Sequence, residues 1–166
     1  MKKTYKILFF SMLFILMLTG CAMDRTEEKS SKPVDEEQQA RSLVKGENPV
    51  KINLISGSTV IEAELDNSET SKQFVSTLPI TLSMKRSDDR EYYARIPKLS
   101  ENGNAIPDYE NGDVTYYTKG PSFAVFFAKA GKSSQGNLIR MGKVTSDLSL
   151  FEQLGNEATI TIELKK

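Results

Sequence analysis

The pattern of hydrophobic and polar positions divides the chain into three segments. Near the N-terminus an apolar run extends from Ile7 to Leu18 and is interrupted by a single serine. The next segment, residues 22–48, is polar and charged and has no apolar stripe of helical or strand period before Leu43. From about Pro49 onward, apolar and polar positions alternate with a period of two in many short runs, which is typical of β-strands. The pattern therefore predicts a leader, a polar spacer and a β-rich domain.

The alternating runs predict eight strands, which end at turn residues such as Gly, Pro, Asn, Asp and Ser. They cover residues 50–54, 59–65, 80–84, 91–96, 114–117, 123–128, 138–144 and 158–164. The first two runs are separated by a Ser-Gly turn signal and form a predicted hairpin. Many short strands with few helices are typical of a closed or nearly closed barrel, which leaves no strand edge exposed.

Two short helices are expected between these strands. The first begins after a capping residue, Asn67 or Ser68, and ends near Thr77, because a side-chain oxygen at this position can accept a hydrogen bond from the first helical turn. The second is a helical turn over residues 147–154. Residues 97–111, which contain Gly, Pro and three Asn, are expected to form a long loop.

The N-terminal run has the features of a secretory signal. Three lysines in the first six residues form a basic start, and the apolar run is too short for a membrane span, which needs about 20 residues. The run leads directly into Leu18-Thr19-Gly20-Cys21, which resembles the bacterial lipobox. This resemblance implies that residues 1–20 are a lipoprotein signal peptide. The Cys21 thiol first receives a diacylglyceryl group, and a signal peptidase then cleaves the chain before Cys21. The alternative is an ordinary secreted protein with a chance Cys near its cleavage site.

Lipidation would attach the protein to a membrane, because two or more acyl chains anchor a protein stably. We expect a partner membrane that is bound through Cys21, on the extracytoplasmic face of the cell membrane. Ala22 gives no Asp-based retention signal, so in a cell with two membranes we expect the outer membrane. Residues 21–48 then hold the lipidated Cys and a disordered tether, whose 27-residue spacer would span roughly 30 Å. A short helix over residues 35–44 is the alternative, because residues 36–41 are all good helix formers.

Several weak motifs in the β-rich region follow one another in an order similar to that of the bacterial cyclophilin-like family. They are Leu65-Asp66-Asn67, Phe74, Leu78-Pro79-Ile80-Thr81-Leu82, Gly112-Asp113-Val114-Thr115-Tyr116-Tyr117, Ala124-Val125-Phe126-Phe127 and Met141-Gly142-Lys143-Val144. The resemblance covers most of residues 50–164. It implies a mainly β fold over residues 49–166, a closed eight-stranded barrel with two short helices. Residues 118–121 depart from the family pattern, so the resemblance predicts the fold but not the shape of that loop.

Composition excludes several classes of function. The chain has no His and one Cys, so it lacks the commonest general base, the commonest zinc ligand and any disulfide within the chain. Without the three N-terminal lysines, 19 basic residues stand against 22 acidic residues. The mature protein is therefore not a polycation, and we expect no nucleic-acid partner. We also predict no cofactor and no metal.

The residues used by cyclophilin isomerases are not found. Those enzymes carry a different residue pattern, with a Phe-His-Arg stretch, a Gln, and a Trp or His that lines an apolar groove. The strand arginines here are Arg95 and Arg140, and Arg140 beside Met141 is the better candidate for an isomerase donor. The favoured interpretation of both arginines is that they face outward on a solvated surface of the barrel. The sequence thus predicts no catalytic residue.

Adjacent aromatic residues on the strands suggest a binding surface. Because successive side chains of a strand point to opposite faces, each aromatic pair has one ring inside the barrel and one outside. Tyr93 and Tyr117 are the candidates for the outside, and with Arg140 and Met141 they form a candidate ligand groove. Packing in the core or on the barrel surface is the alternative for each of these residues.

The densest group of carboxylates is Asp108, Glu110 and Asp113. Calcium sites use convergent carboxylates and carbonyls, but this spacing does not match the twelve-residue calcium loop. A turn that enters a strand is the more typical role of such a segment.

These observations predict a lipid-anchored, extracytoplasmic lipoprotein whose barrel binds a peptide, a small ligand or an envelope protein. Two alternatives stay open at this point. One is a divergent extracytoplasmic peptidyl-prolyl isomerase. The other is an accessory lipoprotein of an envelope or transport complex, with no small ligand of its own. Fold alone does not decide among them.

Overall fold

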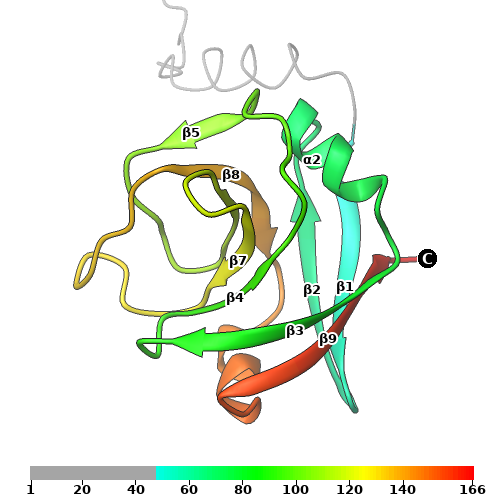
Figure 1. The fold of residues 1–166 in the computed structure, drawn as a ribbon. Coiled ribbons are helices and arrows are strands. Elements are labelled where there is room, and N and C mark those ends of the chain that lie inside the picture. Colours follow the sequence, from blue (N-terminus) through cyan, green and yellow to red (C-terminus); the bar gives the residue numbers. More distant parts are fainter. Residues whose placement is uncertain (1–47) are drawn as a thin grey trace, which may run out of the picture. The chain divides into compact units, whose positions relative to one another are not determined.

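A computed structural model describes residues 48–166, which form one antiparallel β-sheet that closes on itself (Figure 1). The elements are β1 (Val50–Ser56), β2 (Thr59–Leu65), α2 (Glu69–Val75), β3 (Ile80–Ser87), β4 (Glu91–Arg95), β5 (Asn104–Ile106), β6 (Asp113–Tyr117), β7 (Ser122–Phe126), β8 (Leu138–Val144), the 3₁₀-helix η1 (Leu148–Gln153) and β9 (Glu157–Leu164). The signal peptide, Cys21, all but the last residue of the tether and the alternative helix at 35–44 lie outside the described residues.

Eight strands close the barrel, which confirms the predicted fold class. Their order is β2-β1-β9-β3-β4-β7-β6-β8, and β8 pairs back to β2. Closure requires a glycine at position 142, opposite Leu65, because a Cβ atom there would lie 2.0 Å from the Glu64 carbonyl oxygen. The absence of a side chain at Gly142 therefore lets β8 approach β2 closely enough to complete the ring.

The prediction of a long loop over residues 97–111 is only partly correct, because this segment contains a ninth strand. The three residues of β5 pair with the first half of β8, with Asn104 opposite Arg140 and Ile106 opposite Leu138. β2 pairs with the second half of β8. A strand of three residues is too short to show a period of two, and Pro107 ends it at once. For that reason the pattern of the sequence does not reveal it.

The two predicted helices are present on opposite ends of the barrel (Figure 1). Ser68 is the N-cap of α2, and its hydroxyl accepts a hydrogen bond from the Ser71 N–H. The Phe74 ring of α2 stacks on Phe123 of β7 at a centroid distance of 4.7 Å. At the other end η1 contributes Phe151, which lies 5.5 Å from the Phe127 ring. Each helix therefore covers one end of the apolar interior.

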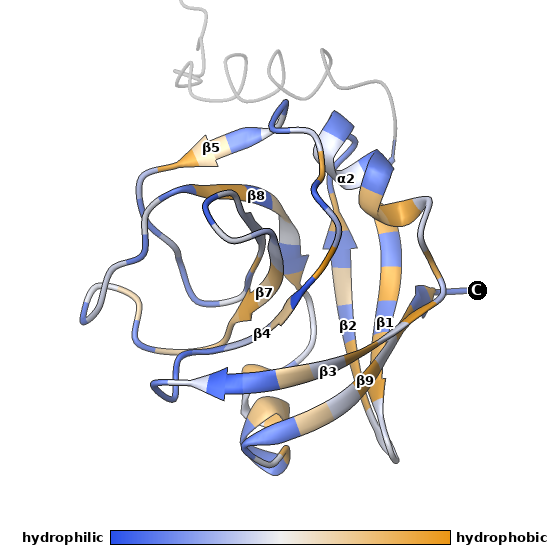
Figure 2. Cartoon of the chain, in the orientation of Figure 1, coloured by the Kyte–Doolittle hydropathy of each residue, from blue (hydrophilic) through white to orange (hydrophobic). Residues whose placement is uncertain are grey.

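Four strands have the alternation of a sheet with one buried face. Along β1, β2, β3 and β9 buried residues alternate with more exposed ones, and Figure 2 shows the corresponding change of hydropathy along these ribbons. The inward side chains fill the barrel. The largest fully buried ones of this interior are Tyr92, Tyr116, Phe74, Phe123, Phe151, Ile52, Leu54, Ile61, Leu65 and Met84.

The strands β6 and β7 differ, because most of their residues are buried on both faces. Their inner residues belong to the barrel interior, while Ala124 and Phe126 form a second cluster with Tyr109 and Leu138. We call these four residues the outer cluster. Within residues 48–166, no helix has the length and the apolar character that crossing a membrane requires.

Candidate functional site

The outward side chains of β4 and β7 lie opposite one another in three rows. Glu91 pairs with Phe126, Tyr93 with Ala124, and Arg95 with Ser122. The residues between them, such as Tyr92 and Ala94, point into the barrel interior. This surface of the barrel is therefore built by alternate residues of two neighbouring strands.

Small side chains in the middle of this surface leave a depression, which we call the outer groove. Ser122 and Ala124 are flanked by the larger Tyr93 on one side and by Tyr117 and Leu138 on the other. The cavity volume is about 250 Å³. Its lining residues are Ser87, Glu91, Tyr93, Arg95, Tyr117, Gly120, Ser122, Ala124, Phe126, Gln135 and Leu138.

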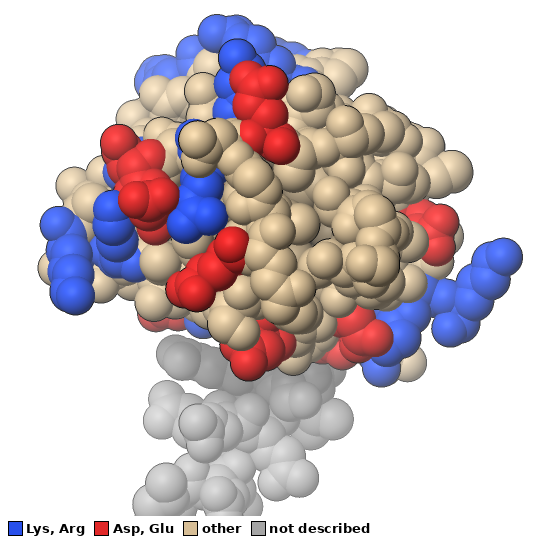
Figure 3. Space-filling view, turned by 90° about the horizontal axis from the view of Figure 1, so that it is seen from below, with Lys and Arg blue, Asp and Glu red and all other residues tan. Residues whose placement is uncertain are grey.

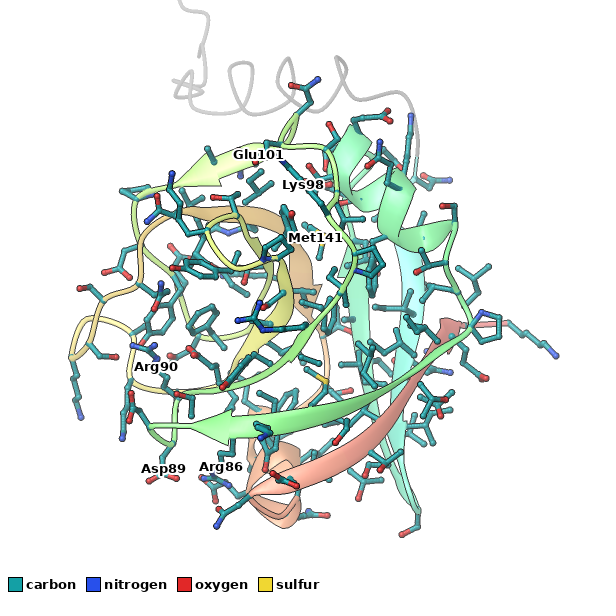
Figure 4. All side chains as sticks on the ribbon, in the orientation of Figure 1. Arg86, Asp89, Arg90, Lys98, Glu101 and Met141 are labelled. Carbon is teal, nitrogen blue, oxygen red and sulfur yellow. The ribbon has the colours of Figure 1, made fainter. Side chains whose placement is uncertain are left out.

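The structure brings two of the four sequence-predicted groove residues together. Tyr93, which is 36% exposed, and Tyr117 both line the outer groove from opposite sides of β7. Met141 is completely buried in the barrel interior (Figure 4). Arg140 lies on the outer surface but forms an ion pair with Asp113, and it does not line the groove.

Arg90 holds the side chain of Glu91 in place at one end of the outer groove. Its Nε lies 2.7 Å from Glu91 Oε2, and its Nη2 lies 3.3 Å from Glu91 Oε1 and 3.1 Å from Gln135 Oε1. The guanidinium also lies 5.9 Å from the ring centres of Tyr109 and Phe126, within the range of cation–π contacts. Figure 4 shows Arg90 on the side of the barrel where these loops lie. One buried cation thus joins β4, the outer cluster and the loop that carries Gln135.

The pKa of Glu91 is shifted by its surroundings. Glu91 is 8% exposed, and the desolvation of its carboxylate raises the pKa above the ordinary value. The hydrogen bond from Arg90 acts in the opposite direction but does not cancel this effect. The same hydrogen bond is the main cause of the raised pKa of Arg90. The Glu91 carboxylate is paired with Arg90 and is therefore not available to bind a cationic ligand.

The loop at residues 129–137 is held in place by contacts with the segment that precedes β6. The Tyr109 hydroxyl lies 2.6 Å from Ser133 Oγ, and Asp108 Oδ1 accepts a hydrogen bond of 3.0 Å from the Gln135 N–H. Tyr109 in turn stacks on Phe126 at 4.1 Å. These contacts place Gln135 at the edge of the outer groove.

Arg95 has a different environment from the other arginines that the structure describes. It is the last residue of β4 and is exposed. Arg86, Arg90 and Arg140 each form an ion pair, whereas the Arg95 guanidinium makes no hydrogen bond or ion pair within residues 48–166. Arg95 is thus an available cation at the groove.

Two of the three clustered carboxylates, Asp113 and Glu110, form ion pairs with basic side chains. Asp113 is fully buried, and its Oδ1 lies 2.9 Å from Arg140 Nε and 3.9 Å from Lys143 Nζ. Glu110 Oε2 accepts a hydrogen bond of 2.7 Å from Lys143, which lowers the pKa of Glu110. Asp108 instead contacts the loop that carries Gln135. Across residues 48–166, no three His, Cys, Asp or Glu side chains gather as metal ligands would.

Further ion pairs lie at the end of the barrel that η1 covers. Arg86 pairs with Asp89 at 2.9 Å, and Lys85 with Glu157 at 3.6 Å. Figure 3, which shows the barrel from the end that η1 covers, shows both signs of charge interspersed.

The sequence pattern alone does not indicate Glu91, Ser122, Ala124 or Gln135 as residues of a groove. A weak signal was present in the apolar strand from Ser122 to Phe127, where the two small residues stand at alternate positions. Small residues on one face of a strand with large neighbours can form a depression. Their significance depends on the pairing of β7 with β4 and β6, which no local pattern contains.

The closed barrel, its two end-covering helices and a groove on its outer surface define a cyclophilin-like barrel protein. The chain belongs to the cyclophilin-like family, whose model matches residues 54–163. Among solved structures, the chain is similar to the solution structure of a hypothetical protein from Archaeoglobus fulgidus. The TM-score is 0.57 at 20% identity, over 72% of this chain and 98% of that chain, a likeness that concerns the fold alone. No curated protein matches the chain.

Proposed function

We propose that the chain is a lipid-anchored extracytoplasmic lipoprotein whose cyclophilin-like barrel is a binding module. In this proposal the outer groove binds a peptide, a small ligand or a segment of an envelope protein. The observation that carries the binding role is the outer groove itself, which combines a floor of small side chains, two tyrosines and the available cation Arg95. Concave sites with an apolar lining and a few polar groups are the usual form of binding sites.

The size of the groove supports a small occupant. Its volume of about 250 Å³ lies just below the range of about 300–1,000 Å³ that is typical of ligand pockets. One or two amino-acid residues or a compact organic molecule would fit such a space. Tyr93 and Tyr117 can contact an apolar group with their rings and a polar group with their hydroxyls.

The anchoring part of the proposal is tested by the substitution Cys21→Ala. The lipobox implies that the wild-type protein incorporates labelled palmitate and stays with membranes after an alkaline, high-salt wash. The variant should lose the label and be released, while Ser30→Ala in the tether should behave like the wild type. A Cys21→Ala protein that stays on washed membranes would overturn the anchoring proposal.

The binding part is tested by photo-crosslinking in cells. A photoreactive residue at position 93 is compared with one at position 60, since Val60 is also exposed but lies on β2, away from the groove. We expect crosslinked products from position 93 in excess of those from position 60. A product that increases the mass by a whole protein indicates an envelope partner, and a smaller increase indicates a peptide or small ligand. Equal products from the two positions would contradict binding at the groove.

Prolyl isomerisation is a second candidate function, favoured by the position of Arg95 in a groove that also contains the apolar side chain of Ala124 and the rings of Tyr93 and Tyr117. An isomerase needs a donor that weakens the resonance of the prolyl amide, and Arg95 meets this need better than Arg140, which is paired with Asp113. This candidate predicts faster cis-to-trans relaxation of an Xaa-Pro peptide, with the acceleration lost in Arg95→Gln. A relaxation rate unchanged by micromolar protein would exclude it.

A further inference from the structure

We propose that the outer groove recognises a carboxylate carried by a short apolar group, and that Arg95 is the residue that binds the carboxylate. This inference rests on the proposed function, because it names the ligand class of the same groove. It follows from the distribution of charge along the groove, from the order of its lining residues and from its size.

The charges of the groove do not cancel. Among its lining residues, Glu91 and Arg95 are the two that carry a formal charge. Arg90, which lies beneath the surface with a side-chain exposure of 11%, pairs with Glu91 through two contacts. Glu91 is thereby satisfied, and Arg95 is left without a partner within residues 48–166. A ligand with one negative charge would complete the groove.

The order of the residues gives this ligand a direction. Arg95 stands opposite Ser122 at one end of the β4–β7 pair, and Phe126 stands opposite Glu91 at the other end. Ala124 lies between them, so the floor of the groove changes from the hydroxyl of Ser122 to the methyl group of Ala124 in the direction of Phe126. A ligand would therefore place its anion at Arg95 and its apolar part over Ala124, between the side chains of Tyr93 and Tyr117.

A carboxylate suits this end better than a doubly charged phosphate. A single guanidinium offers two parallel N–H donors, which match the two oxygens of one carboxylate. The neighbouring Ser122 hydroxyl already donates its hydrogen to the Gly120 carbonyl at 2.5 Å, so it adds no further donor. The ligand class is thus a monoanion with an apolar group of one or two residues in size. A free peptide C-terminus and a simple organic acid share this chemistry.

The test compares N-acetylphenylalanine with its uncharged amide, by NMR titration of the full chain in detergent micelles. Ligands of this size bind weakly, with dissociation constants of order millimolar. We expect both probes to shift the amide signals of the groove, and the acid to bind about tenfold more tightly than the amide. We expect Arg95→Gln to abolish this preference, and Arg95→Lys to keep part of it because the charge stays but the planar fork is lost.

A matched control separates recognition from general electrostatics. Lys51→Gln removes one positive charge from β1, where Lys51 forms an exposed ion pair with Glu64 at 3.8 Å. This variant should keep the full preference for the acid. Because Arg95 and Lys51 are both exposed, all three variants are expected to fold, and the dispersion of their NMR spectra verifies this. An equal loss of preference in Lys51→Gln and Arg95→Gln would overturn the role of Arg95.

The outcomes separate this inference from the proposed function. If acid and amide shift the groove signals with equal affinity, the carboxylate inference fails while the groove remains a binding site. If the acid shifts only signals outside the groove, or none at about 20 mM, the inference fails, and crosslinking from position 93 decides the proposed function independently. Titrations with 3-phenylpropionate and with a tripeptide that ends in phenylalanine distinguish the sources. Tighter binding of the tripeptide indicates a peptide C-terminus, and equal binding indicates a simple organic acid.

Discussion

The two halves of the barrel differ in how far their outer surfaces are exposed to solvent. In the open half, formed by β1, β2, β9 and β3, the alternate residues that face outward are partly or fully exposed, and most of them are polar. Thr81 and Thr161, for example, face one another across β3 and β9 with their hydroxyl oxygens 2.9 Å apart. In the covered half, formed by β4, β7, β6 and β8, the outer cluster is buried beneath the loops that carry Tyr109 and Gln135.

This difference explains where the groove lies. An apolar outer surface must be covered, because exposing Phe126 and Leu138 to water would cost free energy. The covering segments bury Phe126 beneath Tyr109 and leave a depression beside it, where the side chains of Ser122 and Ala124 are small. The groove is therefore the uncovered margin of a second apolar layer. The open half has no such layer among the described residues.

The largest expected effect concerns the outer cluster. Phe126 is 1% exposed and stacks on Tyr109, so Phe126→Ala should lower the free energy of unfolding by about 3–5 kcal/mol, as in a protein core. Val60→Ala, at an exposed position of the open half, should change it by less than about 0.5 kcal/mol. Chemical denaturation measures both. A cost below about 1 kcal/mol for Phe126→Ala would show that the outer cluster is not a true second core.

A smaller effect is expected for the ion pair that ties β6 to β8 in the covered half. Asp113 is fully buried beside Arg140, and removing one partner of a buried pair costs about 3–5 kcal/mol. The Arg140 side chain is 27% exposed and can regain water, so we expect about 2–3 kcal/mol for Asp113→Ala. Glu110→Gln, at the exposed end of the same group, should cost much less. In the double variant Asp113→Ala/Arg140→Ala the two losses should not add, and strict additivity would exclude a direct coupling.

The smallest effect is a pH dependence that distinguishes the halves. Because burial raises the folded-state pKa of Glu91 above the ordinary value of 4.5, its protonated form is favoured by folding. The contribution of Glu91 to stability is therefore complete below pH 4.5 and is lost as the pH rises through the folded-state pKa. The stability of the wild type relative to Glu91→Gln should fall as the pH rises from about 4 to 7. Glu157→Gln in the open half serves as the comparison, and a rise instead of a fall would contradict the assigned environment.

The open half illustrates what a single sequence can predict. In β2 and β9 the period of two in runs such as Thr59–Leu65 reflects one buried and one solvated face, and the strand positions follow from it. The same period places Tyr93 and Tyr117 outside the barrel, which the burial of Tyr92 and Tyr116 confirms. Local patterning is thus sufficient wherever one face of a strand meets water.

The covered half illustrates what a single sequence does not contain. The groove depends on which residues stand opposite one another on β4 and β7, and on contacts from Gln135, which is 44 residues away from Glu91. Such pairings are non-local and are set by the whole fold. Arg140 and Met141 are adjacent on one strand, so their side chains point to opposite faces. For this reason the two could not line the same surface, although their aromatic surroundings made both attractive candidates.

The central claim, that the groove of the covered half is the binding surface, is tested most directly by one map. Backbone amide signals of the full chain in detergent micelles would be recorded with and without each member of a library of small acids, amides and peptides. The account predicts that the probes that bind shift signals in β4, in β7 and around Gln135, and leave β1, β2 and β9 unchanged. Shifts concentrated on the open half, with the groove signals unmoved, would contradict it.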